Sequence, residues 1–425
     1  MDEQQLQFIW KFGFFDKVNA RTAIGEFIKV LSPGVQNSDA GPDFANARLI
    51  IGSTQWVGSV EVHVRASDWK RHSHQSDKSY DGVILHVVQH NDCEPMRTSS
   101  GVAIPVYEMR FDQSLANRYR QLMESQSFVP CRPLLSSVEN FRLRMFLTRL
   151  AVERMEQRSV RIAEVLEQSG NDWEATFQRM LFRAFGFGVN AQPFEQLAQK
   201  IPVSCIAKHR GSLLQLEALL LGQAGLLNGE PTDEYHRRLL QEYSLLRAKF
   251  SLSPMEQHLW KFLRTRPVNF PTIRLAQLAA LLHSDGNLIA KIMEVKMLKD
   301  CVAIFSVTPS EYWNEHYTFG KISDARSKQL GEKSVERIAA NFVAPMLFAY
   351  GKNRSQEALC EVAVELLEHI APEQNAQIEG WKSMGVKPQS MFESQALLHL
   401  KQAYCDQKKC LQCTIGQQIL QDKKA

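Results

Sequence analysis

A stretch of alternating residues near the N-terminus carries side chains that could do chemistry. In GSVEVHVRASDW, residues 58–69, the polar residues Glu61, His63 and Arg65 are separated by single valines. Residues two apart on a β-strand share one face, so the carboxylate and the imidazole can be aimed at one point. Such a pair can hold a metal ion or move a proton, and an arginine beside it can take up an anion. The pattern predicts a strand whose polar face is either solvated or the floor of a site.

A second carboxylate precedes the neighbouring predicted strand. Asp43 stands in GPDFANARL, directly before the strand expected over 46–52. Two carboxylates with a nitrogen base suit a hard divalent ion such as Mg²⁺ or Mn²⁺, which can position a water and stabilise charge on a phosphate oxygen. We therefore predict that Asp43 and Glu61 bind Mg²⁺ or Mn²⁺. His63 is expected to orient the attacking water.

Three more histidines follow this segment. His72 and His74 lie in a polar connector over 66–80, which we interpret as exposed. His86 lies inside the apolar strand predicted over 81–90, where a core histidine is the simplest interpretation. A different hypothesis makes the protein a small-molecule hydrolase that holds zinc with His63, His74 and His86, and it predicts that these three imidazoles converge.

The C-terminal end carries a cysteine motif. YCDQKKCLQC contains Cys405, Cys410 and Cys413 in the spacing C-x4-C-x2-C, and a two-residue gap lets two thiolates reach one ion. Zinc or a [4Fe–4S] cluster needs a fourth ligand, for which we select Cys131. The alternative is three thiols on a C-terminal helix that bind no metal.

Basic residues mixed with aromatic residues indicate a second kind of site. The segment RTRPVNFPTIR carries Arg264, Arg266 and Arg274 around Phe270. Single-stranded nucleic acid is bound by such mixtures, through phosphate pairing and base stacking. With Arg65, these arginines are our predicted nucleic-acid contacts.

The fold class follows from the change of pattern along the chain. Residues 1–125 read as a mixed α/β domain with a helix expected over 20–31 and strands over 46–52, 54–64, 81–90 and 101–109. Residues 126–425 have mostly helical spacing, and two prolines near 125–135 mark the boundary. We predict an α+β protein with a small sheet followed by a larger all-α domain that ends in the cysteine motif.

Bulk properties narrow the class of protein. The 425 residues are 44% apolar and 23% charged, with a formal net charge of +4, so a nucleic-acid partner is neither required nor excluded. No apolar run approaches the length of a membrane helix, and the N-terminus lacks the pattern of a secretory signal. Eight cysteines in a chain of this length do not suggest a disulfide framework. We expect a cytoplasmic protein without membrane contact, whose protein partners are unspecified.

The order of elements and acids resembles the PD-(D/E)XK nuclease superfamily. Its core runs helix, strands, helix, strand, with an aspartate before one strand and Glu-x-Lys on the next. Here GPD (41–43) and EVH (61–63) occupy those places, so the resemblance implies that Asp43 and Glu61 bind the metal. His63 stands where that family has lysine and lacks its permanent charge, which Arg65 or Lys70 could replace. Some nucleases of this group also close the domain with an iron–sulfur staple of one early and three late cysteines, which the four cysteines above resemble loosely.

Longer strings resemble a bacterial family of unknown function, domain of unknown function 2851. Among them are YDGVILHVV, FGFGVNAQPFEQLA, EALLLGQAGLL and KKCLQCTIG. This resemblance implies a cytosolic bacterial protein and no catalytic residue. Our leading hypothesis is a metal-dependent phosphodiesterase or nuclease that acts on DNA or RNA. The alternative is a non-enzymatic scaffold that binds nucleic acid or protein and is built on a decayed nuclease core.

Overall fold

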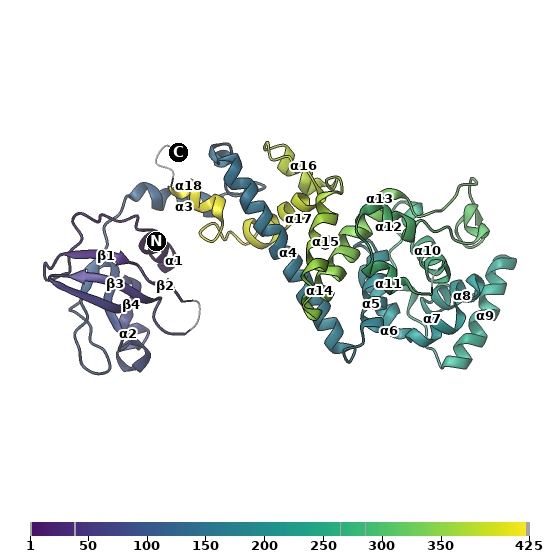
Figure 1. Ribbon diagram of the computed structural model, residues 1–425, viewed down its shortest axis with the longest axis horizontal. Helices are drawn as coiled ribbons and strands as arrows, with labels where there is room; N and C mark the ends of the chain where they lie inside the picture. Colours follow the sequence, from purple (N-terminus) through teal and green to yellow (C-terminus); the bar gives the residue numbers. More distant parts are fainter. Residues whose placement is uncertain (1, 38–39, 264, 285, 422–425) are drawn as a thin grey trace. The chain divides into compact units, whose positions relative to one another are not determined.

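The alternating residues of the opening segment form the central strand of a mixed sheet (Figure 1). The strand order is β1-β3-β4-β5-β6, with β2 paired to β3. The strand β4 runs antiparallel to β3 and parallel to β5. The strands are β1 (Ile28–Ser32), β2 (Val35–Gln36), β3 (Phe44–Ile51), β4 (Thr54–Arg65), β5 (Val83–His90) and β6 (Val106–Glu108).

A crossover segment joins the parallel strands β4 and β5, as that pairing requires. It is built of three short turns of helix and is anchored by Trp69 and Tyr80, which pack in one apolar cluster with Val83. Its turns are α2 (Asp68–Arg71), η1 (His74–Ser76) and η2 (Lys78–Tyr80). This crossover covers the polar face of β4.

The helix α1 (Glu3–Phe12) covers the apolar face of the sheet. Its residues Leu6, Ile9 and Trp10 are fully buried in one core with Val60 and Val62 of β4. The helix begins at a capping box in which the Asp2 side chain accepts from the Gln5 backbone, and it ends at Gly13. The two faces of β4 are therefore covered by different segments, one apolar and one polar.

The computed structural model describes residues 2–37, 40–263, 265–284 and 286–421, which form two units. Unit 1 comprises Met1–Leu143 and Lys401–Ala425, and unit 2 comprises Arg144–Leu400. Besides the sheet, unit 1 contains α3 (Gln113–Glu124), η3 (Arg132–Ser137) and α18 (Thr414–Gln421). This division differs from the sequence prediction, which placed the cysteine motif in the helical domain, because the C-terminal segment packs on α3 and η3.

Unit 2 is mostly helical, with one short hairpin, β7 (His316–Thr318) and β8 (Lys321–Ile322). The unit boundary falls within α4 (Asn140–Gln168). The longer helices that follow are α5 (Trp173–Phe185), α6 (Ala191–Lys200), α8 (Leu213–Gln223), α9 (Glu234–Phe250), α10 (Pro271–Ser284), α12 (Leu298–Phe305), α14 (Ala344–Arg354), α15 (Glu357–Glu368) and α17 (Met391–His399). The shorter ones are α7 (Val203–His209), η4 (Gln257–Leu259), η5 (Pro267–Asn269), α11 (Leu288–Met293), η6 (Glu311–Asn314), α13 (Glu332–Ile338), η7 (Ala339–Val343) and α16 (Ala376–Lys382). The helix η8 (Leu400–Cys405) begins at the last residue of unit 2 and continues into unit 1.

The α+β prediction is confirmed, but one predicted element is wrong. Residues 20–31 do not form a helix, since Ile28–Ser32 is the strand β1 and pairs with β3. Pairing with the sheet buries Ile28 completely, and this tertiary contact overrides the helical spacing of the segment. Among the described helices, none combines the length and the apolar character needed to cross a bilayer.

Candidate metal centre

Two polar side chains of β4 are buried beneath the crossover. The alternation of the strand sends Val60 and Val62 into the core under α1, and it turns Glu61 and His63 to the opposite face. Glu61 is 5% exposed and His63 is 2% exposed, so this polar face is not solvated. A buried carboxylate and a buried imidazole need partners, because leaving them unpaired costs free energy.

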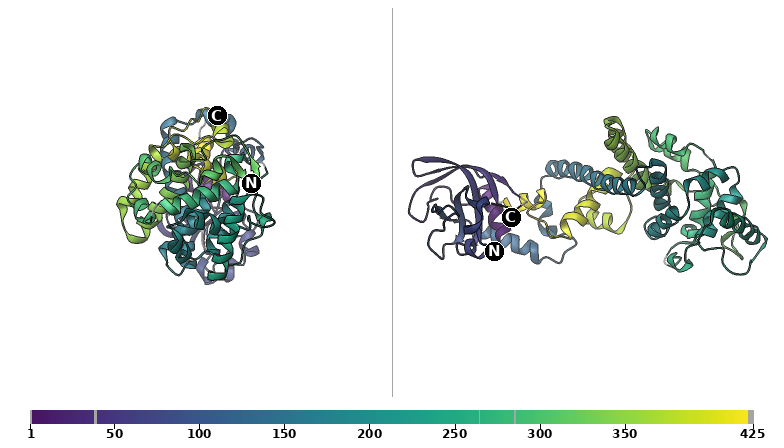
Figure 2. Two further views of the ribbon diagram at one scale, coloured as in Figure 1. Left: turned by 90° about the vertical axis from the view of Figure 1, so that its right-hand side faces the viewer. Right: turned by 90° about the horizontal axis from the view of Figure 1, so that it is seen from below.

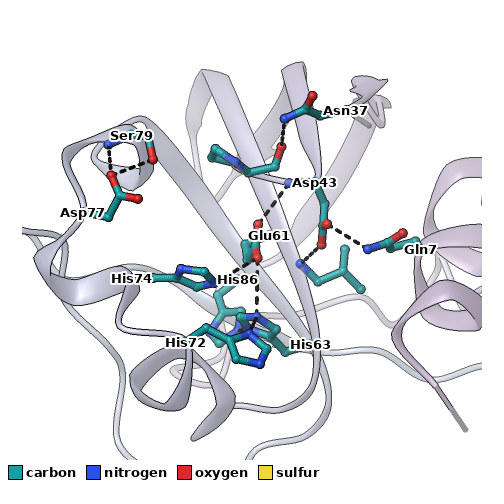
Figure 3. Close-up of polar contacts among 12 residues, drawn as sticks. Gln7, Asn37, Asp43, Glu61, His63, His72, His74, Asp77, Ser79 and His86 are labelled. Carbon is teal, nitrogen blue, oxygen red and sulfur yellow. Dashed lines mark hydrogen bonds and ion pairs between the residues drawn. The ribbon is translucent and has the colours of Figure 1, made fainter. Parts of the chain in front are cut away.

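The crossover supplies two further imidazoles to this face (Figure 3). His72 follows α2 and is exposed, and His74 opens η1 and is buried. The ring of Tyr80 stacks on His74 at 3.7 Å between centroids, which fixes the plane of that imidazole. His63, His72 and His74 each offer a nitrogen, and the three nitrogens lie within 4.8 Å of one another.

The spacing of these donors matches the ligand shell of a tetrahedral metal ion. Nε2 of His63 lies 3.2 Å from Nδ1 of His72. Oε1 of Glu61 lies 3.4 Å from Nε2 of His63 and 3.4 Å from Nε2 of His74. Ligands about 2.0–2.1 Å from a zinc ion stand about 3.3 Å apart along the edges of a tetrahedron. The His63 and His72 nitrogens therefore already stand at this spacing, and the nitrogen of His74 lies within 4.8 Å of both.

A fourth histidine, His86, contacts the ring of His63 on the side opposite His72. Nε2 of His86 lies 2.9 Å from Nδ1 of His63, on the side of the ring away from His72. His86 lies on β5 opposite Glu61 in the register of the sheet, so the parallel pairing itself places it there. A metal-binding histidine usually donates its second ring N–H to such a partner, which fixes its tautomer and orientation.

The imidazoles of His63 and His86 are neutral at physiological pH. Burial, followed by the neighbouring His86, His74 and His72, lowers the pKa of His63 to about 2. Burial, followed by His74, lowers the pKa of His86 to about 3. Neutral imidazole is the form that ligates metal ions. The cluster is thus ready to bind an ion without first losing protons from these two rings.

Asp43 meets Glu61, but through its backbone. The Asp43 N–H donates to Oε2 of Glu61 at 3.0 Å. The Asp43 carboxylate instead accepts from the Val62 N–H at 3.0 Å and from Nε2 of Gln7 on α1 at 2.7 Å. Figure 3 shows this carboxylate directed toward Gln7 rather than toward the histidines. Burial, and then the charge of Glu61, raise the pKa of Asp43 above its usual range.

The buried Glu61 carboxylate and the His74 nitrogen favour the binding of a cation between them. In the described part of the chain, the ion-pair contacts of Glu61 are with His63 and His74, which carry positive charge only when protonated. Nε2 of His74 is buried and makes no hydrogen bond to any described atom. A buried carboxylate and an unsatisfied imidazole nitrogen facing the same space both gain from a divalent ion placed between them.

Of the predicted residues Asp43, Glu61 and His63, the structure places the Glu61 carboxylate beside His63, whereas Asp43 contacts Glu61 only through its backbone N–H. Residues that were not selected from the sequence also reach this region. Gln7 of α1 donates a hydrogen bond to the Asp43 carboxylate. Glu3 lies one turn earlier on α1, and burial raises the pKa of its carboxyl, although the nearby His72 acts in the opposite direction. The spacing of four residues between Glu3 and Gln7 was the available signal, because it places both on one side of α1.

The zinc-hydrolase hypothesis chose His63, His74 and His86, and the structure differs from it in one residue. His72 replaces His86 in the group of mutually close donors, and His86 contacts the far side of His63. The interpretation of His72 and His74 as a plain exposed connector is wrong for His74, which the crossover buries against Trp69 and Tyr80.

The predicted nucleic-acid contacts are scattered. Arg65 is exposed at the end of β4 in unit 1, and Arg266 is exposed in unit 2. Arg264 lies outside the described residues. Arg274 is 6% exposed, donates to Asn269, Gln277 and Ser334, and lies over the ring of Phe187 at 4.1 Å. Its guanidinium is buried and bonded to other side chains of unit 2, so the prediction that it binds phosphate is not supported.

The four predicted cysteine ligands all belong to unit 1. The eight cysteines of the chain are free thiols.

Comparison with known proteins gives a family but no activity. No curated protein and no solved structure matches the chain. A family profile described as Protein of unknown function (DUF2851) matches residues 3–376, which include the whole sheet and the histidine cluster. The chain therefore belongs to the DUF2851 family of proteins of unknown function.

Proposed function

We propose that this protein is a metal-dependent phosphodiesterase that acts on nucleic acid. The observation that carries the proposal is the convergence of His63, His72 and His74 beside the buried carboxylate of Glu61. An ion in this position can polarise a phosphate oxygen and lower the pKa of a bound water. These are the two effects that phosphodiester hydrolysis needs most.

The donor set favours Zn²⁺ over the Mg²⁺ or Mn²⁺ expected from two carboxylates. Imidazole nitrogens suit zinc and similar transition ions, whereas Mg²⁺ prefers an octahedron of oxygens. Asp43 uses both carboxylate oxygens on Gln7 and Val62, which leaves Glu61 as the acid that faces the histidines. We therefore assign the ion to the three imidazoles and keep Asp43 as a positioning residue for Glu61.

Glu61 is the proposed general base. Three protein ligands leave the fourth position of a tetrahedral ion for water, which is typical of catalytic rather than structural zinc sites. Oε1 of Glu61 lies 3.4 Å from Nε2 of both His63 and His74, so it would be within reach of a water on an ion held there, and Oε2 accepts from the Asp43 N–H. A carboxylate held in this way can accept the proton of the attacking water. Because His72 is exposed, a substrate can approach from its side.

The charges at the rim suit an anionic substrate. Arg71 is two-thirds exposed and lies close enough to lower the pKa of His63. Lys70 and Arg65 are exposed on the same part of unit 1. Cations beside a divalent ion favour a phosphate ester over a neutral amide or glycoside. Their spread along the crossover and the end of β4 favours an extended polyanion, such as DNA or RNA.

The test compares hydrolysis of single- and double-stranded DNA and RNA, and of bis(p-nitrophenyl) phosphate, with Zn²⁺, Mn²⁺ and Mg²⁺. We expect hydrolysis that is lost with a chelator and restored best by Zn²⁺ or Mn²⁺. Replacement of exposed His72 in His72→Ala should abolish both metal binding and turnover without disturbing the core. The matched control is His90→Ala, because His90 is an exposed histidine of the same unit outside the cluster.

A second variant separates the roles in the site. Glu61→Gln should retain the ion and lose turnover by about 10²–10⁴-fold, the usual contribution of a general base. Loss of the ion in Glu61→Gln would make Glu61 a ligand and overturn its assignment as the base. If the wild-type protein binds metal but hydrolyses none of these substrates, the proposed phosphodiesterase function is wrong and the non-catalytic scaffold is favoured.

A further inference from the structure

The C-terminal segment belongs to unit 1 and packs beside α3 and η3. Figures 1 and 2 show the C-terminal helix α18 next to α3, although they are far apart in sequence. Arg118 of α3 donates to the Leu420 carbonyl at 3.1 Å, and the Lys408 ammonium donates to the Met123 carbonyl. These bonds fix residues 401–421 against the segment that precedes Leu143, where the chain leaves unit 1.

Four cysteines lie where these segments meet. Cys131 immediately precedes η3, Cys405 ends η8, and Cys410 and Cys413 lie in the turn that leads into α18. Cys131 is 8% exposed, and Cys410 and Cys413 are each 7% exposed. Buried thiols from two distant segments occur here without any disulfide.

The turn that carries Cys410 and Cys413 is tightly shaped. The Cys410 N–H donates to the Lys408 carbonyl at 2.8 Å, and the Cys413 N–H donates to the Lys409 carbonyl at 3.1 Å. Lys408 adopts a left-handed backbone with φ of 52°. A side chain at Gly416 would place its Cβ 2.2 Å from the Cys410 carbonyl oxygen, so only glycine fits there. The backbone is thus held in the form that brings both cysteines back toward η3.

The four thiols lie close enough to affect one another's pKa values. Burial, and then Cys413 and Cys410, raise the pKa of Cys131 to about 12. Burial, and then Cys413, Cys131 and Cys410, raise the pKa of Cys405. Burial, and then Cys413, raise the pKa of Cys410 to about 11. These mutual effects, with the burial and the packing of α18 on η3, indicate that the four thiols lie near one another.

Two lysines lie near these thiols, and one of them, Lys401, also pairs with Asp406. Lys401 acts on Cys405 and Lys408 acts on Cys410, and each opposes the rise in the pKa of its neighbouring thiol. Four thiolates bring four negative charges, which exceed the charge of one divalent ion. Nearby lysines reduce this excess.

The spacing of the sulfurs distinguishes a site for a single zinc ion from a site for an iron–sulfur cluster. A single zinc ion requires four sulfurs about 3.8 Å apart, because each Zn–S bond is about 2.3 Å. Within the described part of the chain, the only group of three or more donors mutually within 4.8 Å is the histidine cluster, so the thiols are spread more widely. In an iron–sulfur cubane each cysteine binds a different iron, which spaces the sulfurs further apart.

We propose that Cys131, Cys405, Cys410 and Cys413 hold a [4Fe–4S] cluster that fastens the C-terminal segment to the α3–η3 part of unit 1. Unit 2 is inserted between the two cysteine-bearing segments, so the cluster closes unit 1 across this insertion. Its role is structural, because metal–thiolate bonds contribute directly to folding free energy. The proposal is independent of the phosphodiesterase site, whose ligands are elsewhere in unit 1.

The test measures iron, acid-labile sulfide and visible absorption of the full chain, expressed with added iron and purified without oxygen. We expect equal amounts of iron and sulfide and the brown absorption of a cubane. Cys131→Ser and Cys410→Ser should each lose most of the iron and sulfide. Cys360→Ser is the control, because Cys360 lies in unit 2 and donates to the Phe348 carbonyl, a bond that serine can keep.

The wild-type protein alone keeps the proposal falsifiable if the serine variants do not fold. Apo-protein treated with ferrous iron and sulfide under reducing conditions should regain the cluster, with spectra unlike those of iron bound without sulfide. Stoichiometric zinc on the four cysteines, or no iron and sulfide after this reconstitution, would overturn the proposal.

Discussion

His63 shows how a single residue takes its role from its neighbours. One ring nitrogen faces His72 and Glu61, and the other faces His86, so contacts from the crossover, β4 and β5 hold the imidazole in place. Where the nuclease resemblance expected a lysine, a neutral imidazole stands beside a carboxylate. This residue can ligate an ion, but it cannot supply permanent charge.

Strand periodicity was enough to find Glu61 and His63, since a period of two assigns faces without tertiary information. The same reasoning did not find His72 and His74. They lie in a connector with no period, and their positions depend on Trp69 and Tyr80 packing beneath them. Cys131 is predicted as a partner of the C-terminal cysteines because a metal centre needs a fourth ligand, and all four residues belong to unit 1.

Acid should destabilise the metal-free protein through the buried histidines. The pKa values of His63 and His86 fall from about 6.5 in the unfolded chain to about 2 and 3 in the folded one. Their contribution to stability is therefore present above pH ~6.5 and is lost as the pH falls from there toward 3. Each histidine adds up to about 1.4 kcal/mol per pH unit to the free energy of unfolding.

Urea unfolding of chelator-treated protein between pH 7.5 and 5 measures this effect. The variant His86→Leu cannot be protonated at this position and should show a shallower dependence on pH. Equal slopes in the variant and the wild type would show that His86 is not buried as a neutral ring.

At the scale of elements, the site depends on the close parallel pairing of β4 and β5. Glu61 pairs with His86 in register, and β4 can approach β5 because Gly58 has no side chain. The sequence predicted both strands. It did not predict that β1 replaces a helix, because pairing with β3 is a contact between distant residues.

Gly58→Ala should separate these strands. The added Cβ would lie 2.4 Å from Cγ2 of Ile84 and 2.7 Å from the Gly82 carbonyl oxygen. We expect a loss of about 1–3 kcal/mol in the free energy of unfolding, together with weaker zinc binding, because His86 moves away from His63. Gly82→Ala is the matched control, since no atom lies within 4 Å of its Cβ. Thermal unfolding that leaves both variants equal to wild type would contradict this account of the pairing.

At the scale of the whole molecule, the histidine ligands and the four cysteines belong to unit 1, and the chain between its two parts forms unit 2. Metal ions should therefore stabilise one unit and not the other. The sequence separated a mixed sheet from helices, but the return of the C-terminal segment to unit 1 depends on packing against α3 and η3.

Zinc at 100 times its dissociation constant should stabilise unit 1 by about 2.7 kcal/mol and leave unit 2 unchanged. Calorimetry of the apo-protein with and without zinc measures this as a rise in the Tm of one transition. The rise should persist in Cys131→Ser and disappear in His72→Ala, which separates the histidine cluster from the cysteines. A shift of both transitions, or one that survives in His72→Ala, would assign the stabilising zinc to another site.

The most direct measurement is anomalous X-ray scattering at the zinc edge, from crystals of the full chain grown with zinc. A zinc ion held by the histidine cluster should give a peak about 2.0–2.1 Å from Nε2 of His63, Nδ1 of His72 and Nε2 of His74, with a water or phosphate oxygen in the remaining position. A peak bound by other residues, or none at this cluster with zinc present in excess, would contradict this account.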